Sequence, residues 1–202
     1  AAGVNLLAMV LVAFLFGALL GTGLPPAPTY IITALVIAPP MIKVGVDPWV
    51  VHFFAFFLGV WGELTPPTSV AAAVTAKIAE ASFMRTLFAS RSICVSLFVL
   101  MAGVFTRPEL VLEPGLAQLG AMALILTATV GVTFSIQGRF TERPGLDIVL
   151  RLFLAAFALI VLLHPDRQIA IAACLPVGLY VGYWILRRRG IPGIAPASVG
   201  RT

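Results

Sequence analysis

Charged residues are almost absent from the first fifth of this sequence. Residues 1–42 contain no Asp, Glu, Lys, Arg or His, and only 10% of the 202-residue chain is charged. A soluble globular domain carries about 25% charged residues, whereas this chain is 60% hydrophobic with a mean hydropathy of +1.08. These values exclude a soluble domain. They predict an all-α polytopic membrane protein, because helices satisfy their own backbone groups in lipid.

Cysteines and enzyme motifs are also scarce. The two cysteines, Cys94 and Cys174, lie in different apolar segments, so we expect small buried side chains rather than a disulfide or metal site. The sequence has no G-x-x-x-x-G-K-[ST], H-E-x-x-H or G-x-S-x-G motif. We therefore predict neither an enzyme nor a cofactor. The net charge of +5 comes from basic residues at the ends of apolar runs, which does not favour nucleic-acid binding.

The uncharged run is interrupted by a segment rich in glycine and proline, Gly21-Thr22-Gly23-Leu24-Pro25-Pro26-Ala27-Pro28-Thr29. A helix of 42 residues would be about 63 Å long, against a hydrocarbon core of about 30 Å. Proline and glycine end a helix, so we predict a re-entrant hairpin with helices over 4–20 and 29–38. Broken backbone at membrane depth must be buried in protein or line a watery cavity. The tip is therefore a candidate site.

A second apolar run, 49–76, is interrupted at Gly62-Glu63-Leu64-Thr65-Pro66-Pro67-Thr68. The two prolines stop the incoming helix, and Thr65 is expected to cap the next one. Half-helices over about 49–61 and 67–79 would form one discontinuous transmembrane helix. Further transmembrane helices are predicted over 83–105, 116–136, 146–163 and 168–186, before a loose tail over 190–202.

Basic residues fall unequally on the two sides of these predicted spans. One side receives ten of them, namely Lys77, Arg85, Arg91, Arg139, Arg143, Arg151, Arg187, Arg188, Arg189 and Arg201. The other side receives three, namely Lys43, Arg107 and Arg167. Because cytoplasmic loops carry an excess of Lys and Arg, the first side is predicted to be cytoplasmic. The hairpin would then enter and leave from the outer face.

The two breaks share the pattern G-x-x-x-P-P, and 41 residues separate Gly21 from Gly62. Each break would expose carbonyls, which with Thr hydroxyls suit sodium, and amides, which suit a carboxylate. Paired breaks of this kind are typical of the binding sites of secondary transporters, although ordinary kinks are the structural alternative. We predict ion and substrate binding by Gly21, Thr22, Gly23, Leu24, Pro25, Pro26, Thr29, Gly62, Glu63, Thr65, Pro66, Pro67 and Thr68. The possible sodium ligands among them are Gly21, Thr22, Gly62, Thr65 and Thr68.

Glu63 is the one acidic residue between Asp47 and Glu80. An ionisable group at membrane depth is costly and is a functional hypothesis by default. Glu63 could bind a cation, carry a proton or cap a helix. The two histidines, His52 and His164, are expected to be packed or interfacial. Trp49, Trp61 and Trp184 are expected to be interfacial anchors or packing residues.

Several segments in order resemble one family: Gly23-Leu24-Pro25-Pro26-Ala27-Pro28-Thr29-Tyr30, Ala38-Pro39, Lys43-Val44-Gly45-Val46, His52-Phe53-Phe54-Ala55-Phe56-Phe57-Leu58-Gly59 and Glu63-Leu64-Thr65-Pro66-Pro67. The family is the large permease subunit of tripartite ATP-independent periplasmic (TRAP) transporters, in particular the fused TAXI type. The resemblance covers roughly residues 4–105. Residues beyond 108 look like the extra C-terminal helices found on some fused TAXI permeases.

The resemblance implies an elevator-type importer of the bacterial inner membrane, driven by an ion gradient. A periplasmic solute-binding protein would deliver an organic acid. Residues 1–80 would be part of the transport domain, with the hairpin over 4–38 and the broken helix over 49–79. Residues 81–106 would complete the permease core, and 107–202 would add helices and a tail. Glu63 stands where the family more often has Asp, which leaves sodium and proton coupling both open.

The chain begins Ala1-Ala2-Gly3 without a basic flank, which is typical of the C-terminal part of a longer polypeptide. We therefore expect the N-terminal half of the permease, or a small membrane subunit, as a partner within the bilayer. Two other readings stay open. One is a channel-like pore, and the other is a membrane scaffold that transports nothing.

Overall fold

A computed structural model describes residues 2–64 and 69–189, with side chains for 6–64 and 69–186. All secondary structure in this part of the chain is α-helical. The helices are α1 (Ala2–Gly21), α2 (Pro26–Lys43), α3 (Pro48–Gly62), α4 (Val70–Ile78), α5 (Phe83–Ile93), α6 (Ser96–Thr106), α7 (Glu109–Leu112), α8 (Leu116–Gln137), α9 (Pro144–Leu163) and α10 (Arg167–Arg189). The predicted tail over 190–202 lies outside the described residues.

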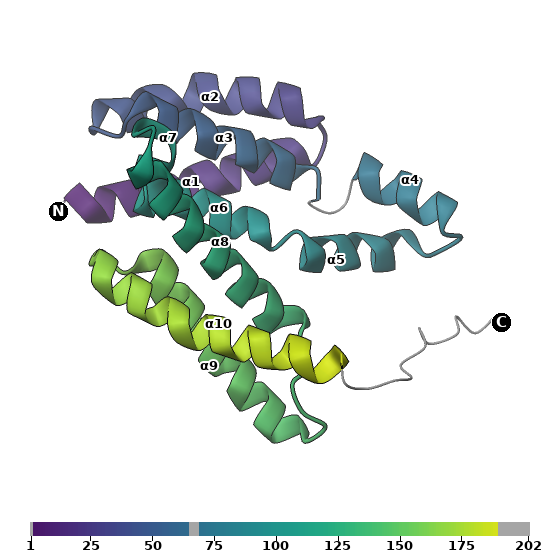
Figure 1. The fold of residues 1–202 in the computed structure, drawn as a ribbon. Helices are drawn as coiled ribbons and strands as arrows, with labels where there is room; N and C mark the ends of the chain where they lie inside the picture. Colours follow the sequence, from purple (N-terminus) through teal and green to yellow (C-terminus); the bar gives the residue numbers. More distant parts are fainter. Residues whose placement is uncertain (1, 65–68, 190–202) are drawn as a thin grey trace.

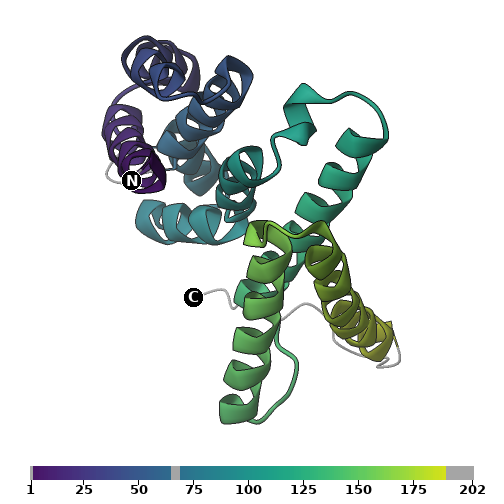
Figure 2. The same cartoon turned by 90° about the vertical axis from the view of Figure 1, so that its left-hand side faces the viewer.

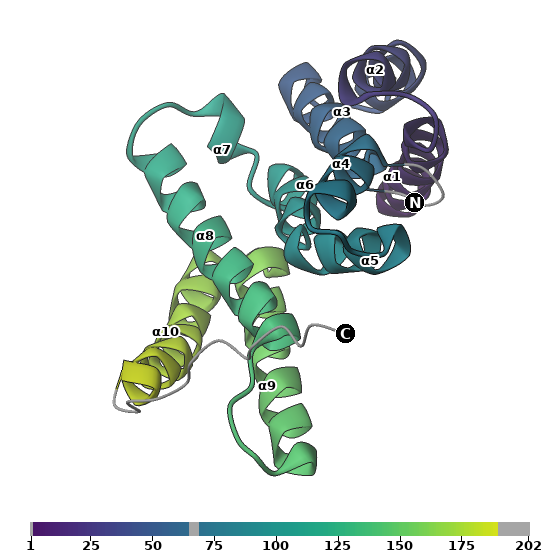
Figure 3. The same cartoon turned by 90° about the vertical axis from the view of Figure 1, so that its right-hand side faces the viewer.

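The helices form two groups on either side of α6. The first group is α1, α2 and α3, which all contact one another, and the second is α8, α9 and α10. Helix α6 contacts α3 on one side and both α8 and α9 on the other. Figure 1 shows the two groups, with α4 and α5 extending away from α3 and α6. The turned views in Figures 2 and 3 show the same separation, with the α8–α10 group standing apart from α1–α3.

Four stretches are long and apolar enough to cross a membrane. They are Phe83–Thr106, Leu116–Gln137, Pro144–Leu163 and Arg167–Leu186. Each matches a predicted transmembrane segment to within two residues. The prediction of an all-α polytopic membrane protein is therefore confirmed.

The first of these spans contains an interruption that the sequence did not predict. Cys94 and Val95 form a turn between α5 and α6. The amides of Leu97 and Phe98 donate to the carbonyls of Cys94 and Val95, three residues back rather than four. This tighter bonding separates the span into two helices without any proline.

The hairpin is present, but its second arm is longer than predicted. Helix α2 begins at Pro26 rather than residue 29, because proline is tolerated in the first helical turn. It ends at Lys43 rather than residue 38, so Pro39 and Pro40 lie inside it. The predicted stop at these prolines was wrong. Met41, which follows them, is fully buried against α3, and this packing stabilises a helix whose prolines have removed two amide donors.

The second break is also present, but the helix after it starts later than predicted. Helix α4 begins at Val70, and Ser69 is its N-cap, with the Ser69 hydroxyl accepting a 3.0 Å hydrogen bond from the amide of Ala72. The predicted helix start near residue 67 was therefore wrong, and Thr65, the predicted cap, lies outside the described residues. Serine is among the strongest N-capping residues, and here it lies directly before the apolar run.

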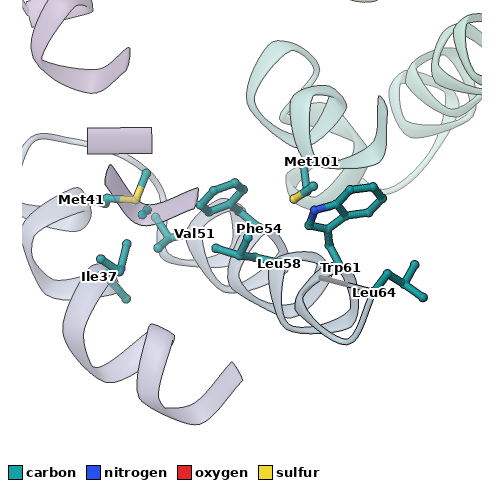
Figure 4. Close-up of a cluster of buried hydrophobic side chains, with 10 residues drawn as sticks. Ile37, Met41, Val51, Phe54, Leu58, Trp61, Leu64 and Met101 are labelled. Atoms are coloured by element: carbon teal, nitrogen blue, oxygen red, sulfur yellow. The ribbon is translucent and has the colours of Figure 1, made fainter. Parts of the chain in front are cut away.

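Helix α3 supplies more of the core of the first group than any other helix does. Val51, Phe54, Leu58 and Trp61 are buried, and they point between α2 and α6 in Figure 4. Trp61 lies beside Met101 of α6, and its ring centroid is 4.1 Å from that of Phe98. The C-terminal end of α3 is therefore held between the hairpin and α6.

One buried cation joins the second group to the rest of the chain. Arg107 follows α6 and is only 5% exposed. Its guanidinium donates hydrogen bonds to the carbonyls of His164 (2.7 Å) and Val161 (3.5 Å) at the C-terminal end of α9. Cationic side chains are favourable at this end of a helix, where carbonyls lack intrahelical partners.

The loop between α8 and α9 is tied down by side chains of α9 and α10. The carboxylate of Asp147 accepts hydrogen bonds from the amides of Phe140 (2.7 Å) and Thr141 (3.2 Å). The indole of Trp184 donates a 2.8 Å hydrogen bond to the carbonyl of Arg139. Trp184 was expected to be an anchor or packing residue, and it fixes this loop.

Candidate functional site: two helix breaks in contact

The two predicted breaks meet at a pair of glycines. A Cβ added to Gly62 would lie 2.8 Å from the Cα of Gly21, and a Cβ added to Gly21 would overlap the backbone of Gly62. Real Cβ atoms do not approach other atoms this closely, so only glycine allows the last turns of α1 and α3 to touch. The first halves of the two G-x-x-x-P-P segments are thus side by side in space.

The other arm of the hairpin rests on the same turn of α3. A Cβ added to Gly59 would lie 2.9 Å from the carbonyl oxygen of Pro26 and 3.3 Å from the amide nitrogen of Tyr30. Gly17 of α1 packs against Leu58. The end of α3 therefore lies against the tip of the hairpin, in contact with the last turn of α1 and the first turn of α2.

Gly17 and Gly59 were missed by the sequence analysis. Gly17 and Gly21 form a G-x-x-x-G pattern on α1, and Gly59 precedes Gly62 by three residues on α3. Small residues at such spacing let membrane helices approach closely. That signal was available from the sequence, but it does not say which helix the glycines face.

The first break is exposed at Gly23 and Pro25 and half-buried at Thr22. The hydroxyl of Thr22 donates a 2.7 Å hydrogen bond to the carbonyl of Leu19. Gly23 is exposed, and a Cβ added to it would meet nothing within 4 Å. Among the described residues, none donates a hydrogen bond to the carbonyls of Gly21, Thr22 or Gly23. These three consecutive carbonyls are the oxygen atoms of the tip that could coordinate a hard cation.

The hydroxyl of Thr29 is bonded to the backbone of the tip itself. Thr29 is fully buried, and its hydroxyl donates to the carbonyls of Pro25 (3.0 Å) and Leu24 (3.3 Å). The amide of Thr29 also donates to Pro25. In this arrangement the Thr29 hydroxyl satisfies carbonyls between the tip and the start of α2.

Glu63 bridges the second break. It is half-buried directly after Gly62, and its Oε1 accepts a 3.0 Å hydrogen bond from the amide of Ala71, eight residues later. Of the three roles that the sequence left open for Glu63, the geometry matches the capping of a helix. Together with Ser69, Glu63 satisfies two amides in the first turn of α4, which the sequence analysis had expected to be free for a carboxylate.

Part of the predicted site lies outside the described residues, namely Thr65, Pro66, Pro67 and Thr68. Of the predicted sodium ligands, the structure therefore describes Gly21, Thr22 and Gly62. The described part of the chain holds no cluster of three or more His, Cys, Asp or Glu residues with metal-binding geometry. The oxygen atoms gathered at the breaks are backbone carbonyls, the Thr22 hydroxyl and the Glu63 carboxylate.

His52 lies on α3, away from the breaks, and is packed as expected. Its Nδ1 is 3.1 Å from the hydroxyl of Tyr30 on α2, and both side chains are half-buried. The pair adds a polar contact between the second arm of the hairpin and α3. Nothing in this geometry brings His52 to Gly21 or Glu63.

The comparisons with known proteins identify a family. Residues 1–110 match the family model described as the DctM component of the tripartite ATP-independent periplasmic transporter. No curated protein and no solved structure matches the chain. The matched segment contains both breaks and ends within α7. Given this match and the four candidate spans, the chain belongs to the DctM family of TRAP transporter permease components, which are multi-pass proteins of the inner membrane.

Proposed function

We propose that this chain forms part of an ion-gradient-driven permease that imports an organic acid delivered by a periplasmic solute-binding protein. The two helix breaks form part of its transport site. Carbonyls of Gly21, Thr22 and Gly23 coordinate the coupling cation, and the substrate carboxylate binds beside them. We propose sodium as the coupling ion, because sodium takes oxygen ligands and the tip offers oxygen donors. Proton coupling is the alternative.

The observation that carries this proposal is the contact between Gly21 and Gly62. Two unrelated kinks would have no reason to meet, whereas a transport site requires two broken helices at one point. The contact also places the open carbonyls of the tip next to the end of α3. A cation held there and an anion bound close to it would stabilise each other.

The division of the chain follows from the same proposal. Residues 1–80, with the hairpin and the broken helix, form part of a transport domain that moves as in an elevator. Residues 81–106 complete the permease core, and 107–202 are additional helices and the tail, as in a fused TAXI permease. The remaining N-terminal permease half, or a small membrane subunit, would supply the rest of the site and the fixed scaffold.

Uptake into proteoliposomes tests the proposal. The permease that contains this chain is reconstituted with its binding protein, and ¹⁴C-labelled succinate, glutamate, lactate and benzoate are offered one at a time. An inward sodium gradient and an inward proton gradient are imposed in separate experiments. We expect saturable uptake of at least one acid under the sodium gradient. Uptake under the proton gradient alone would show that the coupling ion is the proton and not sodium.

The two rival functions give different results in the same vesicles. A channel-like pore would pass the acid without saturation and without dependence on either gradient. A scaffold would give no uptake of any acid under any gradient. Either result, obtained with correctly inserted protein, would contradict the proposed function.

A further inference from the structure

Arg91 of α5 points toward the end of α3. Its guanidinium carbon lies 5.7 Å from the centre of the Trp61 ring, and Trp61 is itself 4% exposed. Trp61 directly precedes Gly62 and Glu63, the residues of the second break. Arg91 therefore lies next to the point where the two breaks meet, although it belongs to neither.

The depth of Arg91 in the membrane is unusual for a cation. It lies eight residues after Phe83, the first residue of a 24-residue candidate span, which is about 12 Å at 1.5 Å per residue. Half of a hydrocarbon core is about 15 Å, so a span that starts at Phe83 and runs along the membrane normal would place Arg91 near the midplane. The sequence analysis had counted Arg91 among cytoplasmic charges, but it lies inside the candidate span, two residues before the end of α5.

Arg91 has no anionic partner in the described part of the chain. The one ion pair found there joins Arg151 and Asp147, and the guanidinium of Arg91 donates no hydrogen bond to any described residue. A cation at membrane depth is expensive and pairs with another charged group, or with carbonyls, when its role is structural. The face of Trp61 attracts a guanidinium, but it leaves the N–H donors of Arg91 unused.

We propose that Arg91 binds the carboxylate of the transported acid. The guanidinium carries two parallel N–H donors that match a carboxylate, and Trp61 holds it against the end of α3. The Arg91 side chain supplies the positive charge that the first turn of α4 does not, since Glu63 and Ser69 already occupy two amides of that turn. This inference deepens the proposed function and rests on it.

Snorkelling to the membrane surface is the structural alternative for a long basic side chain. Arg85, six residues earlier on α5, is exposed and suits that description. Arg91 differs because it is half-buried and lies over a ring of another helix. Arg85→Gln is therefore a matched control, since it removes the same charge from the same helix away from Trp61.

The test compares uptake by Arg91→Gln, Arg91→Lys and Arg85→Gln in the proteoliposomes described above. The probe is the labelled acid of the panel with the highest uptake by the unchanged permease. We expect Arg91→Gln to raise the KM for this acid about tenfold or more, because a charge-assisted bidentate contact is lost. Arg91→Lys should give a smaller increase in KM, because the ammonium keeps the charge but lacks the two parallel N–H donors of the guanidinium. Arg85→Gln should stay within about twofold.

A competition assay separates carboxylate binding from a general effect on folding. Uptake is inhibited with succinate or succinamide, and with lactate or lactamide. In the unchanged permease we expect the acid of each recognised pair to inhibit far better than its amide. In Arg91→Gln this preference for the acid should largely disappear, and in Arg85→Gln it should persist.

The outcomes distinguish this inference from the proposed function. If the unchanged permease transports an acid and Arg91→Gln keeps both its KM and its preference for the acid over the amide, Arg91 does not bind the carboxylate. An equal rise in KM for Arg85→Gln and Arg91→Gln would also overturn the inference, because it would show a general effect of charge. Absence of uptake by the unchanged permease would contradict the proposed function itself, and with it the role of Arg91.

Discussion

Gly21 and Gly62 touch backbone to backbone, at the last residue of α1 and the last residue of α3. Each glycine ends a helix, and each is followed by a break whose remaining residues lead to two prolines. The contact removes any room for a side chain at either position. It is the relationship on which the proposed transport site depends.

Replacing either glycine by alanine should force the two helix ends apart. We expect Gly62→Ala to destabilise the protein by about 1–3 kcal/mol, the usual cost of overpacking, and to lower uptake strongly. Thermal unfolding in detergent and uptake in proteoliposomes measure the two effects. Gly178→Ala in α10 is the matched control, because a Cβ there meets nothing within 4 Å. Equal behaviour of the two variants would mean that the backbone contact is not needed.

Gly23 offers a substitution that separates stability from function. It lies exposed at the tip with open space around it, so Gly23→Leu should change the free energy of unfolding by no more than about 0.5 kcal/mol. If the tip binds ion and acid, the leucine side chain should reduce uptake at least tenfold. Normal uptake by normally inserted Gly23→Leu would remove the tip from the site.

Glu63 should behave as a hydrogen-bond acceptor rather than as a proton carrier. Gln can still accept the amide of Ala71 through its side-chain carbonyl, so Glu63→Gln should keep most of its uptake, with an unchanged dependence on the sodium and proton gradients. Glu63→Ala removes the bridge between α3 and α4. We expect it to lose about 1 kcal/mol of stability and to raise the KM for the acid.

Asp47 provides the control for Glu63. Its carboxylate also caps a helix, accepting a 2.8 Å hydrogen bond from the amide of Trp49 at the opposite end of α3. Asp47→Ala should therefore cost similar stability without changing the KM. Loss of proton-driven uptake in Glu63→Gln, with Asp47→Asn unaffected, would show instead that the Glu63 carboxyl itself carries the proton.

Arg107 should stabilise the attachment of the α8–α10 group. Arg107→Ala removes charge-assisted hydrogen bonds to the C-terminal end of α9, which are worth about 1.5–3 kcal/mol. We expect a lower midpoint of thermal unfolding in detergent. Arg143→Ala, at an exposed loop position, should stay within about 0.5 kcal/mol. A midpoint unchanged by Arg107→Ala would show that apolar packing alone holds the group.

The two interruptions rich in glycine and proline could be predicted from residue types alone, whereas the turn at Cys94 and Val95 and the ends of the helices could not. Gly21 to Pro26 and Gly62 to Pro67 identify the breaks because proline cannot donate and glycine costs helix stability. Pro39 and Pro40 carry the same local signal, yet α2 continues through them. The difference is the burial of Met41 beyond them, which depends on α3 and is not written in the local sequence.

The sequence by itself determined that this chain is a helical membrane protein with two broken helices, because apolar length and the Gly/Pro positions act locally. It also carried the motifs of the DctM family. The tertiary structure alone decided that Gly21 meets Gly62, that Glu63 caps α4 across the break, and that Arg91 lies over Trp61 at the same place. The contacts of Gly21 with Gly62 and of Arg91 with Trp61 join residues distant along the chain, and the contact of Glu63 with Ala71 crosses the break between α3 and α4. Side-chain packing between helices fixes them, and no local pattern records which faces will meet.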